Sequence, residues 1–190
     1  MNNFSLYPLP SIHFGPGKLN TLPELASSFG SRQLIITGKG SFTNSSYWLD
    51  LQDKLEQKSL SIFTATVKGE PSPTDIDTIT NSMAENNLDA VIAVGGGSVL
   101  DSGKAVAAML KEGGPVKDYL EGVGTKKPSG KTLPFIAVPT TSGTGSEATA
   151  NSVISQTGKD GFKKSLRHRN YVPDIALIDP ELTLSCPESV

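Results

Sequence analysis

The sequence predicts a doubly wound, mainly parallel α/β sheet in one domain. Short apolar runs typical of buried strands alternate with amphipathic helical stretches between residues 33 and 110. Within this region the stretch 88–110, LDAVIAVGGGSVLDSGKAVAAML, joins a strand, a glycine turn and a helix directly. Loops of small residues follow two apolar runs, at 95–98 and 139–147. Because parallel sheets bind ligands at the carboxyl ends of their strands, both loops are candidate binding segments.

Composition limits the classes of function. The 190 residues have the length of one ordinary domain, and 36% of them are apolar, which suits a globular protein. A net charge of −2 predicts neither nucleic-acid nor membrane binding, and no apolar run is long enough to cross a bilayer. Cys186 is the single cysteine, which rules out an internal disulfide, and the N-terminus shows no secretory signal. We therefore expect a cytoplasmic protein.

The first half of the chain is expected to contain three βα repeats. Two prolines among apolar residues make 4–14 an edge strand or extended arm, so residues 1–14 form an N-terminal extension of the domain. The elements expected next are a helix at 19–29, a buried strand at 33–37, a helix at 45–58, a strand at 60–67, a helix capped by Thr74, and the central strand 90–94.

The second half continues the sheet after a loop-rich segment. Residues 111–132 are polar and rich in Gly and Pro, which predicts an exposed connection with a short helical turn. After it we expect a strand at 133–138, the small-residue loop 139–147, a strand at 148–155, a basic turn at 157–169 and a strand at 174–178. The basic turn is either a solvated face or a clamp on a nucleotide phosphate.

The turn Gly95-Gly96-Gly97-Ser98 is a candidate anion seat. Glycines without a Cβ let their N–H groups approach a ligand, and the helix that follows aims its free amides and positive dipole end at the same place. A merely tight turn is the alternative. The pattern is not G-x-G-x-x-G, because Leu100 occupies the last glycine position.

Ser98 and Asp101 admit two interpretations. Their spacing is that of a capping box, which alone would explain both residues. A carboxylate beside a pyrophosphate would be repelled, so in a real site Asp101 should point towards ribose or carboxamide donors.

The loop PTTSGTGSE (139–147) offers five hydroxyls, which are neutral donors for phosphate and ribose oxygens; a flexible loop is the alternative. The two histidines, His13 and His168, lack the company of a metal motif or of a paired nucleophile, so neither a metal site nor a nucleophilic catalyst is predicted.

Two motifs carry a resemblance to a known family. VGGGSVLDSGKAVA (94–107) and PTTSGTGSEAT (139–149) resemble the GGGSxxDxAK turn and PTTxGTGSE loop in the N-terminal half of iron-containing (group III) alcohol dehydrogenases. The segments FGPGKLNTLPEL, EPSPT, GFKKSLRH and PDIALIDPELTLSCP agree as well. One departure is Ser102-Gly103 in place of a more usual Ala pair, which is expected to cost helix stability.

The resemblance implies a Rossmann-like domain, residues 1–190, that binds NAD or NADP. The implied contacts are a pyrophosphate cradle at Gly95, Gly96, Gly97 and Ser98, Asp101 at the nicotinamide end, Thr140, Thr141 and Thr144 on the adenosine and phosphate side, and Val153, Lys163 and Leu182 completing the cleft. Where NAD-preferring relatives place an Asp, this chain has Gly38, Lys39 and Ser41. With no carboxylate to repel a 2′-phosphate, NADP(H) is expected to bind at least as well as NAD(H).

The resemblance also implies what residues 1–190 lack. In the family Fe²⁺, or sometimes Zn²⁺, is held by an Asp and three His of an all-helical C-terminal domain, and it activates a primary or secondary alcohol for hydride transfer to the nicotinamide. Those ligands are expected beyond Val190, so the chain contains no catalytic residue and is expected to be inactive alone. The alternatives are a dehydroquinate synthase-like or maleylacetate reductase-like relative, and a stand-alone nucleotide-binding or dimerisation module. A homodimer that pairs through the arm 4–14 is expected.

Overall fold

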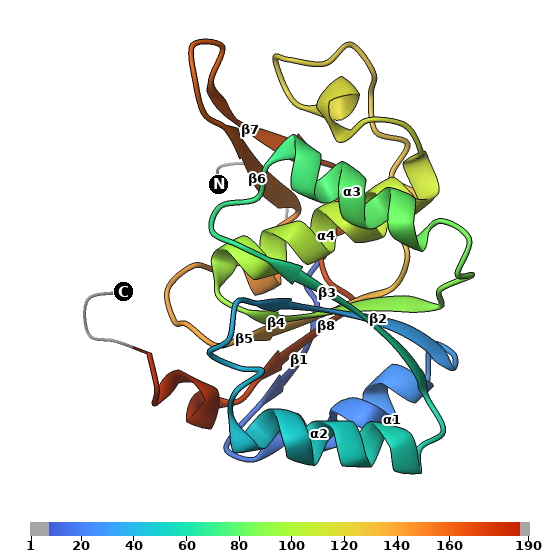
Figure 1. The fold of residues 1–190 in the computed structure, drawn as a ribbon, viewed down its shortest axis with the longest axis vertical. Coiled ribbons are helices and arrows are strands. Elements are labelled where there is room, and N and C mark those ends of the chain that lie inside the picture. Colours follow the sequence, from blue (N-terminus) through green and yellow to red (C-terminus); the bar gives the residue numbers. More distant parts are fainter. Residues whose placement is uncertain (1–7, 187–190) are drawn as a thin grey trace, which may run out of the picture.

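A computed structural model describes residues 8–186, which form a six-stranded sheet with helices on both faces (Figure 1). The sheet order is β1-β8-β5-β4-β2-β3 and every neighbouring pair is parallel. Its strands are β1 (Ser11–Phe14), β2 (Arg32–Gly38), β3 (Ser61–Val67), β4 (Ala90–Gly95), β5 (Phe135–Pro139) and β8 (Ile175–Ile178). The predicted doubly wound, parallel α/β fold is confirmed.

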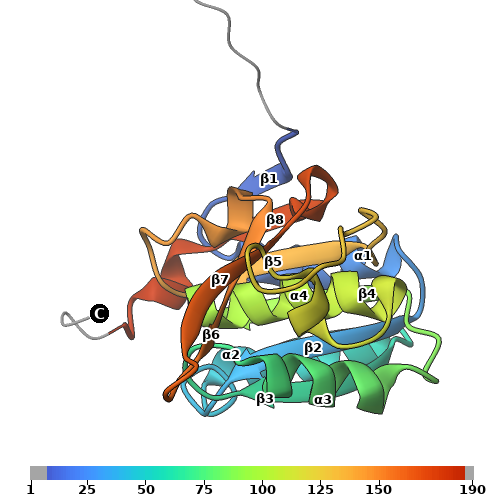
Figure 2. The ribbon, with the colours of Figure 1, turned by 90° about the horizontal axis from the view of Figure 1, so that it is seen from above.

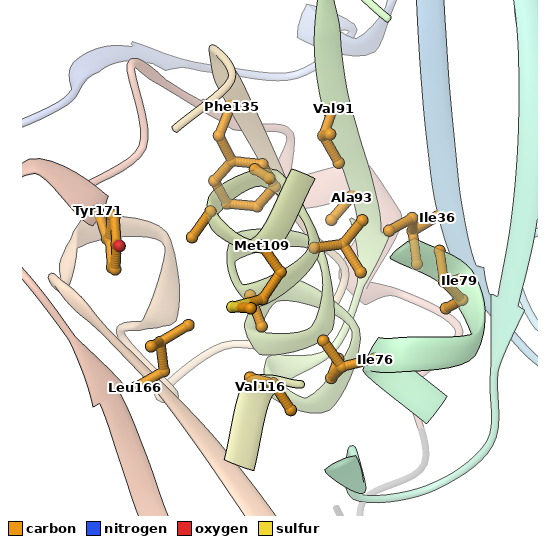
Figure 3. Close-up of a cluster of buried hydrophobic side chains, with 14 of the residues drawn as sticks. Ile36, Ile76, Ile79, Val91, Ala93, Met109, Val116, Phe135, Leu166 and Tyr171 are labelled. Carbon is orange, nitrogen blue, oxygen red and sulfur yellow. The ribbon is translucent and has the colours of Figure 1, made fainter. Parts of the chain in front are cut away.

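The helices divide between the two faces of the sheet. In both ribbon views α1 (Leu22–Ser27) and α2 (Ser46–Gln57) cover one face, while α3 (Pro73–Met83) and α4 (Gly97–Glu112) cover the other (Figures 1 and 2). Each layer has its own apolar cluster. The cluster under α3 and α4 is the larger, and Figure 3 shows Met109 of α4 at its centre, with Ile76 and Ile79 of α3 on one side and Leu166 and Tyr171 on the other.

The sheet order creates a switch point between β2 and β4. These strands are neighbours, yet the chain leaves β2 for α2 on one face and leaves β4 for α4 on the other. The two loops therefore diverge at the carboxyl edge and leave a crevice, which is where open α/β sheets bind ligands. The fold thus places the glycine turn of 95–98 at this crevice.

Helix α4 packs against β4 and β5 through Gly103. An added Cβ at this position would lie 2.6 Å from Ala93 Cβ and 2.8 Å from a ring carbon of Phe135. The expectation that Gly103 only weakens the helix is therefore incomplete. The missing side chain lets the helix lie closer to the sheet than an alanine would allow.

A buried carboxylate joins the two ends of the described chain. Asp179, only 1% exposed, accepts hydrogen bonds from the backbone N–H groups of Gly17 (3.2 Å), Leu19 (2.9 Å) and Glu181 (3.1 Å). Charge-assisted bonds of this kind are among the stronger ones in proteins. They hold the turn after β1 against the short 3₁₀ helix Pro180–Thr183.

Two expected elements have a different form. The basic turn 157–169 is instead part of an antiparallel hairpin, β6 (Asn151–Gln156) and β7 (Phe162–Arg167), in which Lys163, Lys164 and Arg167 are exposed and Leu166 is buried. The helix expected at 19–29 is divided into a 3₁₀ turn, Lys18–Thr21, and the shorter α1. The arm 4–14 is described from residue 8 onward, and its strand is β1; residues 4–7 lie outside the described part.

Two local predictions are corrected as well. Ser72, not Thr74, caps α3: its Oγ accepts from Asp75 N at 3.2 Å and Asp75 reaches back, because Pro73 occupies the first helical position, where a missing N–H costs nothing. The connection 111–132 is exposed only in part, since Val116, Tyr119 and Leu120 are buried in the core.

The packing of α4 predicts that Gly103→Ala destabilises the protein. Alanine improves helix propensity by about 1 kcal/mol, but overpacking costs roughly 1–3 kcal/mol, so a net loss of about 1 kcal/mol is expected. Urea unfolding measures it. Asn81→Ala, on the exposed face of α3, is the control and should not destabilise; a Gly103→Ala variant as stable as that control would contradict the packing argument.

Candidate functional site

Three loops converge at the switch point around a hollow of about 450 Å³. They follow β2, β4 and β5, and the 3₁₀ helix after β8 closes one side. The lining residues are Ser41, Phe42, Asn44, Ser45, Ser46, Tyr47, Gly96, Thr140, Thr141, Glu181, Leu182, Leu184, Ser185 and Cys186. The hollow combines an apolar wall with hydroxyls and the glycine turn, a composition typical of a ligand pocket.

The glycine turn leaves the N-terminus of α4 open. The helix begins at Gly97 with Gly96 as its N-cap residue, and no side chain caps it among the described residues. A Cβ on Gly96 would lie 3.2 Å from Thr141 Oγ1, and one on Gly97 would lie 3.1 Å from Thr144 Cβ. Side chains here would fill the space between the two loops, so the bare backbone suits an anion. Gly95 differs, because its Cβ would collide with Val99 at 2.6 Å, which makes it a packing residue.

A second hollow of about 220 Å³ lies on the other side of the turn and is lined by Glu70, Pro71, Ser98, Asp101, Val153 and Lys163. Lys163 forms an ion pair with Glu70, and both side chains are more than half exposed. Hydrogen bonds from Lys163 and then Ser155 lower the pKa of the Glu70 carboxyl. The lysine predicted to clamp a phosphate therefore has a carboxylate partner.

Asp101 does not form the capping box that its spacing from Ser98 allowed. Instead of capping α4, its carboxylate accepts hydrogen bonds from Ser146 Oγ and from the Val153 N–H at 3.0 Å. Ser146 lies near the end of the loop 139–147, called here the Thr-rich loop, and Val153 lies in β6, so Asp101 joins α4 to both. It still borders the smaller hollow, where a ligand could meet the edge of the carboxylate.

Lys104 is a buried cation that the sequence analysis did not identify as a site residue. It is 2% exposed, and its Nζ donates to the carbonyl oxygens of Ser146 and Asn151, both at 2.8 Å. Burial lowers the pKa of its ammonium from 10.5 to about 8, while the carboxylates of Asp101 and Glu147 act in the opposite direction. The available signal was a lone lysine on an otherwise apolar helix face, next to Ala105 and Val106.

The structure gathers most of the predicted cofactor residues around the two hollows. Ser41, Gly96, Thr140, Thr141 and Leu182 line the larger one, and Ser98, Asp101, Val153 and Lys163 line the smaller one. Lys39 is exposed at the end of β2, and within residues 8–186 neither it nor Gly38 nor Thr144 lines either hollow. The sequence analysis missed Phe42, Asn44, Tyr47, Glu181 and Leu184, whose positions depend on how the loops fold together.

The residues present do not fit a catalytic metal. In the part of the chain that the structure describes, no three His, Cys, Asp or Glu side chains gather closely enough to hold an ion. His13 contacts Ser11, and His168 accepts a hydrogen bond from the Asn170 N–H. A search of the same described residues for a helix that could span a bilayer finds none.

A parallel sheet with an uncapped helix N-terminus at its switch point defines a Rossmann-like α/β domain. The chain belongs to the iron-containing alcohol dehydrogenase family, whose family model matches residues 10–180.

Individual relatives agree with this assignment. Long-chain-alcohol dehydrogenase 1 of Geobacillus thermodenitrificans is 34% identical over 184 residues, which are 95% of this chain and 45% of that protein. Among solved structures, NADH-dependent butanol dehydrogenase A from Thermotoga maritima superposes with a TM-score of 0.90 at 28% identity, covering 100% of this chain and 47% of that one. Sulfoacetaldehyde reductase from Bifidobacterium kashiwanohense, in complex with NAD⁺, gives a TM-score of 0.84 at 32% identity, covering 98% and 49%. The chain thus spans about half the length of the relatives it matches.

The pKa of Lys104 predicts how stability changes with pH. Between pH 8 and pH 10 the unfolded chain binds more protons at this lysine than the folded one, so the free energy of unfolding should rise with pH, by on the order of 2 kcal/mol from this group. Urea unfolding at several pH values measures the rise, and Lys104→Met should abolish it. Identical pH profiles for the two proteins would contradict the lowered pKa.

Proposed function

We propose that this chain is the NAD(P)-binding part of a metal-dependent alcohol dehydrogenase, which transfers hydride between an alcohol or aldehyde and the nicotinamide. The observation that carries the proposal is the open N-terminus of α4 behind the glycine turn, between two hollows. Relatives named as alcohol or butanol dehydrogenases support the reaction class. Within residues 8–186 no three His, Cys, Asp or Glu side chains gather at one place, and the proposal assigns no metal ligand to them.

The two hollows and the turn between them match the three parts of a dinucleotide. The amides of Gly97 and Ser98 would receive the pyrophosphate, since backbone N–H groups and a helix dipole stabilise anions without a counter-charge. The larger hollow, with Thr140, Thr141 and Leu182, would hold the adenosine. The smaller hollow beside Asp101 would hold the nicotinamide end. The domain would thereby fix the ring that accepts the hydride.

The end of β2 supports binding of NADP(H) at least as tight as that of NAD(H). Gly38 is followed by the exposed cation of Lys39, and the hydroxyl of Ser41 borders the larger hollow. An exposed lysine can follow a 2′-phosphate with its flexible stem, and no carboxylate stands at 38–41 to repel that group.

The free edge of the sheet supports a homodimer. Strand β1 is an edge strand, and Ile12 and Phe14 on it are 57% and 66% exposed, with the preceding Leu9 75% exposed. An apolar edge strand with unpaired backbone groups favours addition of another strand, and a second copy of β1 offers the same apolar surface.

The net charge and the cysteine content support a cytoplasmic enzyme that acts on small-molecule substrates. A net charge of −2 gives no attraction to nucleic acid, and the single Cys186 needs no oxidising compartment.

Cofactor binding to the purified chain tests the proposed function. Titration with NADH, followed by its fluorescence, should show saturable binding, and Gly96→Val should weaken it by about tenfold or more, because the valine side chain blocks the approach to the amides. Ala84→Val, at an exposed position after α3, introduces the same valine side chain away from the cleft and should leave the affinity unchanged. Equal affinity of the Gly96→Val variant and the parent chain would refute the cradle.

Cofactor preference provides a second test. NADPH is expected to bind at least as tightly as NADH, and Lys39→Asp should weaken NADPH binding by about tenfold while NADH binding changes by less than about threefold. Lys111→Asp, an equal charge change at the far end of α4, serves as control. If the parent chain bound NADPH about tenfold more weakly than NADH, the preference would be wrong.

A further inference from the structure

Two residues of helix α4, Asp101 and Lys104, form hydrogen bonds with the end of the Thr-rich loop and with the segment that follows it. The Ser146 Oγ and the Val153 N–H donate to the Asp101 carboxylate, and the Ser152 Oγ donates to the Asp101 backbone oxygen at 2.7 Å. Lys104, about one turn further along the helix, adds the bonds from its ammonium.

The Lys104 ammonium is surrounded by acceptors from this segment alone. Besides the carbonyl oxygens of Ser146 and Asn151 at 2.8 Å, the hydroxyl oxygens of Ser146 and Thr149 lie 3.4 Å away. A cation that is 2% exposed cannot exchange these partners for water. Separation of the loop from the helix would leave a buried charge unpaired, which is strongly unfavourable.

These hydrogen bonds connect the two walls of the proposed cofactor cleft, which are the glycine turn and the Thr-rich loop. Lys104 lies on the same helix whose first turn supplies the amides of Gly97 and Ser98. Its acceptors begin at Ser146, two residues after Thr144, whose side chain would contact a Cβ at Gly97. The Thr140 N–H donates to the Gly95 oxygen at 3.0 Å and holds the start of the loop to the glycine turn, whereas Lys104 holds the end of the loop to α4 without lining either hollow.

We propose that Lys104 is a positioning residue for cofactor binding, which holds the loop 139–149 at the spacing from the glycine turn that a dinucleotide requires. This inference rests on the proposed dinucleotide function. A site whose supporting contacts are loose by about 1 Å loses affinity although every contacting group is present. An apolar side chain could pack at this buried position, but it could not donate hydrogen bonds to the carbonyl oxygens of Ser146 and Asn151. A lysine can do both.

Binding and stability together test the role of Lys104. Lys104→Met keeps an unbranched side chain that lacks only the terminal position, removes the ammonium donors, and should weaken NADH binding by about tenfold or more. Two controls should keep the parent affinity within about threefold: Lys111→Met, which removes an exposed charge from α4, and Met109→Ala, which destabilises the same helix by a core cavity. Urea unfolding confirms that each variant is folded under the binding conditions.

A second variant addresses failure of Lys104→Met to fold. Ser146→Ala removes only the hydroxyl that contacts both Lys104 and Asp101, from a residue that lines neither hollow among those described. It should weaken NADH binding by about threefold to fivefold.

Hydrogen exchange of the unliganded chain gives a readout independent of affinity. The backbone amides of 144–153 should exchange faster in Lys104→Met than in the parent chain, whereas Met109→Ala should leave their relative protection unchanged.

The outcomes distinguish a failure of the positioning role of Lys104 from a failure of the proposed dinucleotide binding. If the parent chain does not bind NADH, the proposed function fails and the positioning role fails with it. If the parent chain binds NADH and the Lys104→Met variant binds equally well with unchanged exchange at 144–153, only the positioning role is overturned. Weaker binding together with faster exchange confined to this segment supports it.

Discussion

The close contact between α4 and the sheet is the constraint on which the site depends. The helix that offers free amides at the switch point must lie directly against β4 and β5, and Gly103 permits this approach where any Cβ would meet Ala93 and Phe135. The same closeness brings Asp101 and Lys104 within reach of the segment after β5. Packing of one helix therefore sets both the direction of its N-terminus and the place of the opposite loop.

The two walls of the cleft are held by different physical means. The glycine turn is fixed by its continuity with β4 and by the collision-free packing of Gly95 on Val99. The Thr-rich loop has little apolar content and is held through hydrogen bonds from its far end to α4. The loop can therefore present hydroxyl groups to the larger hollow, whereas an apolar core would bury such groups without water. This division explains how so polar a segment can form one wall of the larger hollow.

The sequence predicted the parallel sheet, the glycine turn and the facing loop, because each depends on local patterns: β-branched runs, glycines before a helix, and hydroxyls after a strand. It did not predict the hairpin of β6 and β7, because a basic, half-exposed strand pair resembles a solvated turn until it packs on α4. The packing role of Gly103 and the buried hydrogen bonds of Lys104 were not predicted, for a related reason. Helix propensity depends on neighbouring residues in the sequence. The close contact of Gly103 with Ala93 and the burial of the Lys104 ammonium depend instead on residues far away in the sequence.

Asp179 links the turn after β1 to the 3₁₀ helix Pro180–Thr183. Its carboxylate holds the turn after β1 through Gly17 and Leu19, and it caps the 3₁₀ helix that carries Leu182 to the wall of the larger hollow. The free edge of the sheet and the wall of the larger hollow thus belong to one hydrogen-bonded unit. Asp179 and the parallel pairing of β1 with β8 therefore couple the edge strand to the residues that line the larger hollow.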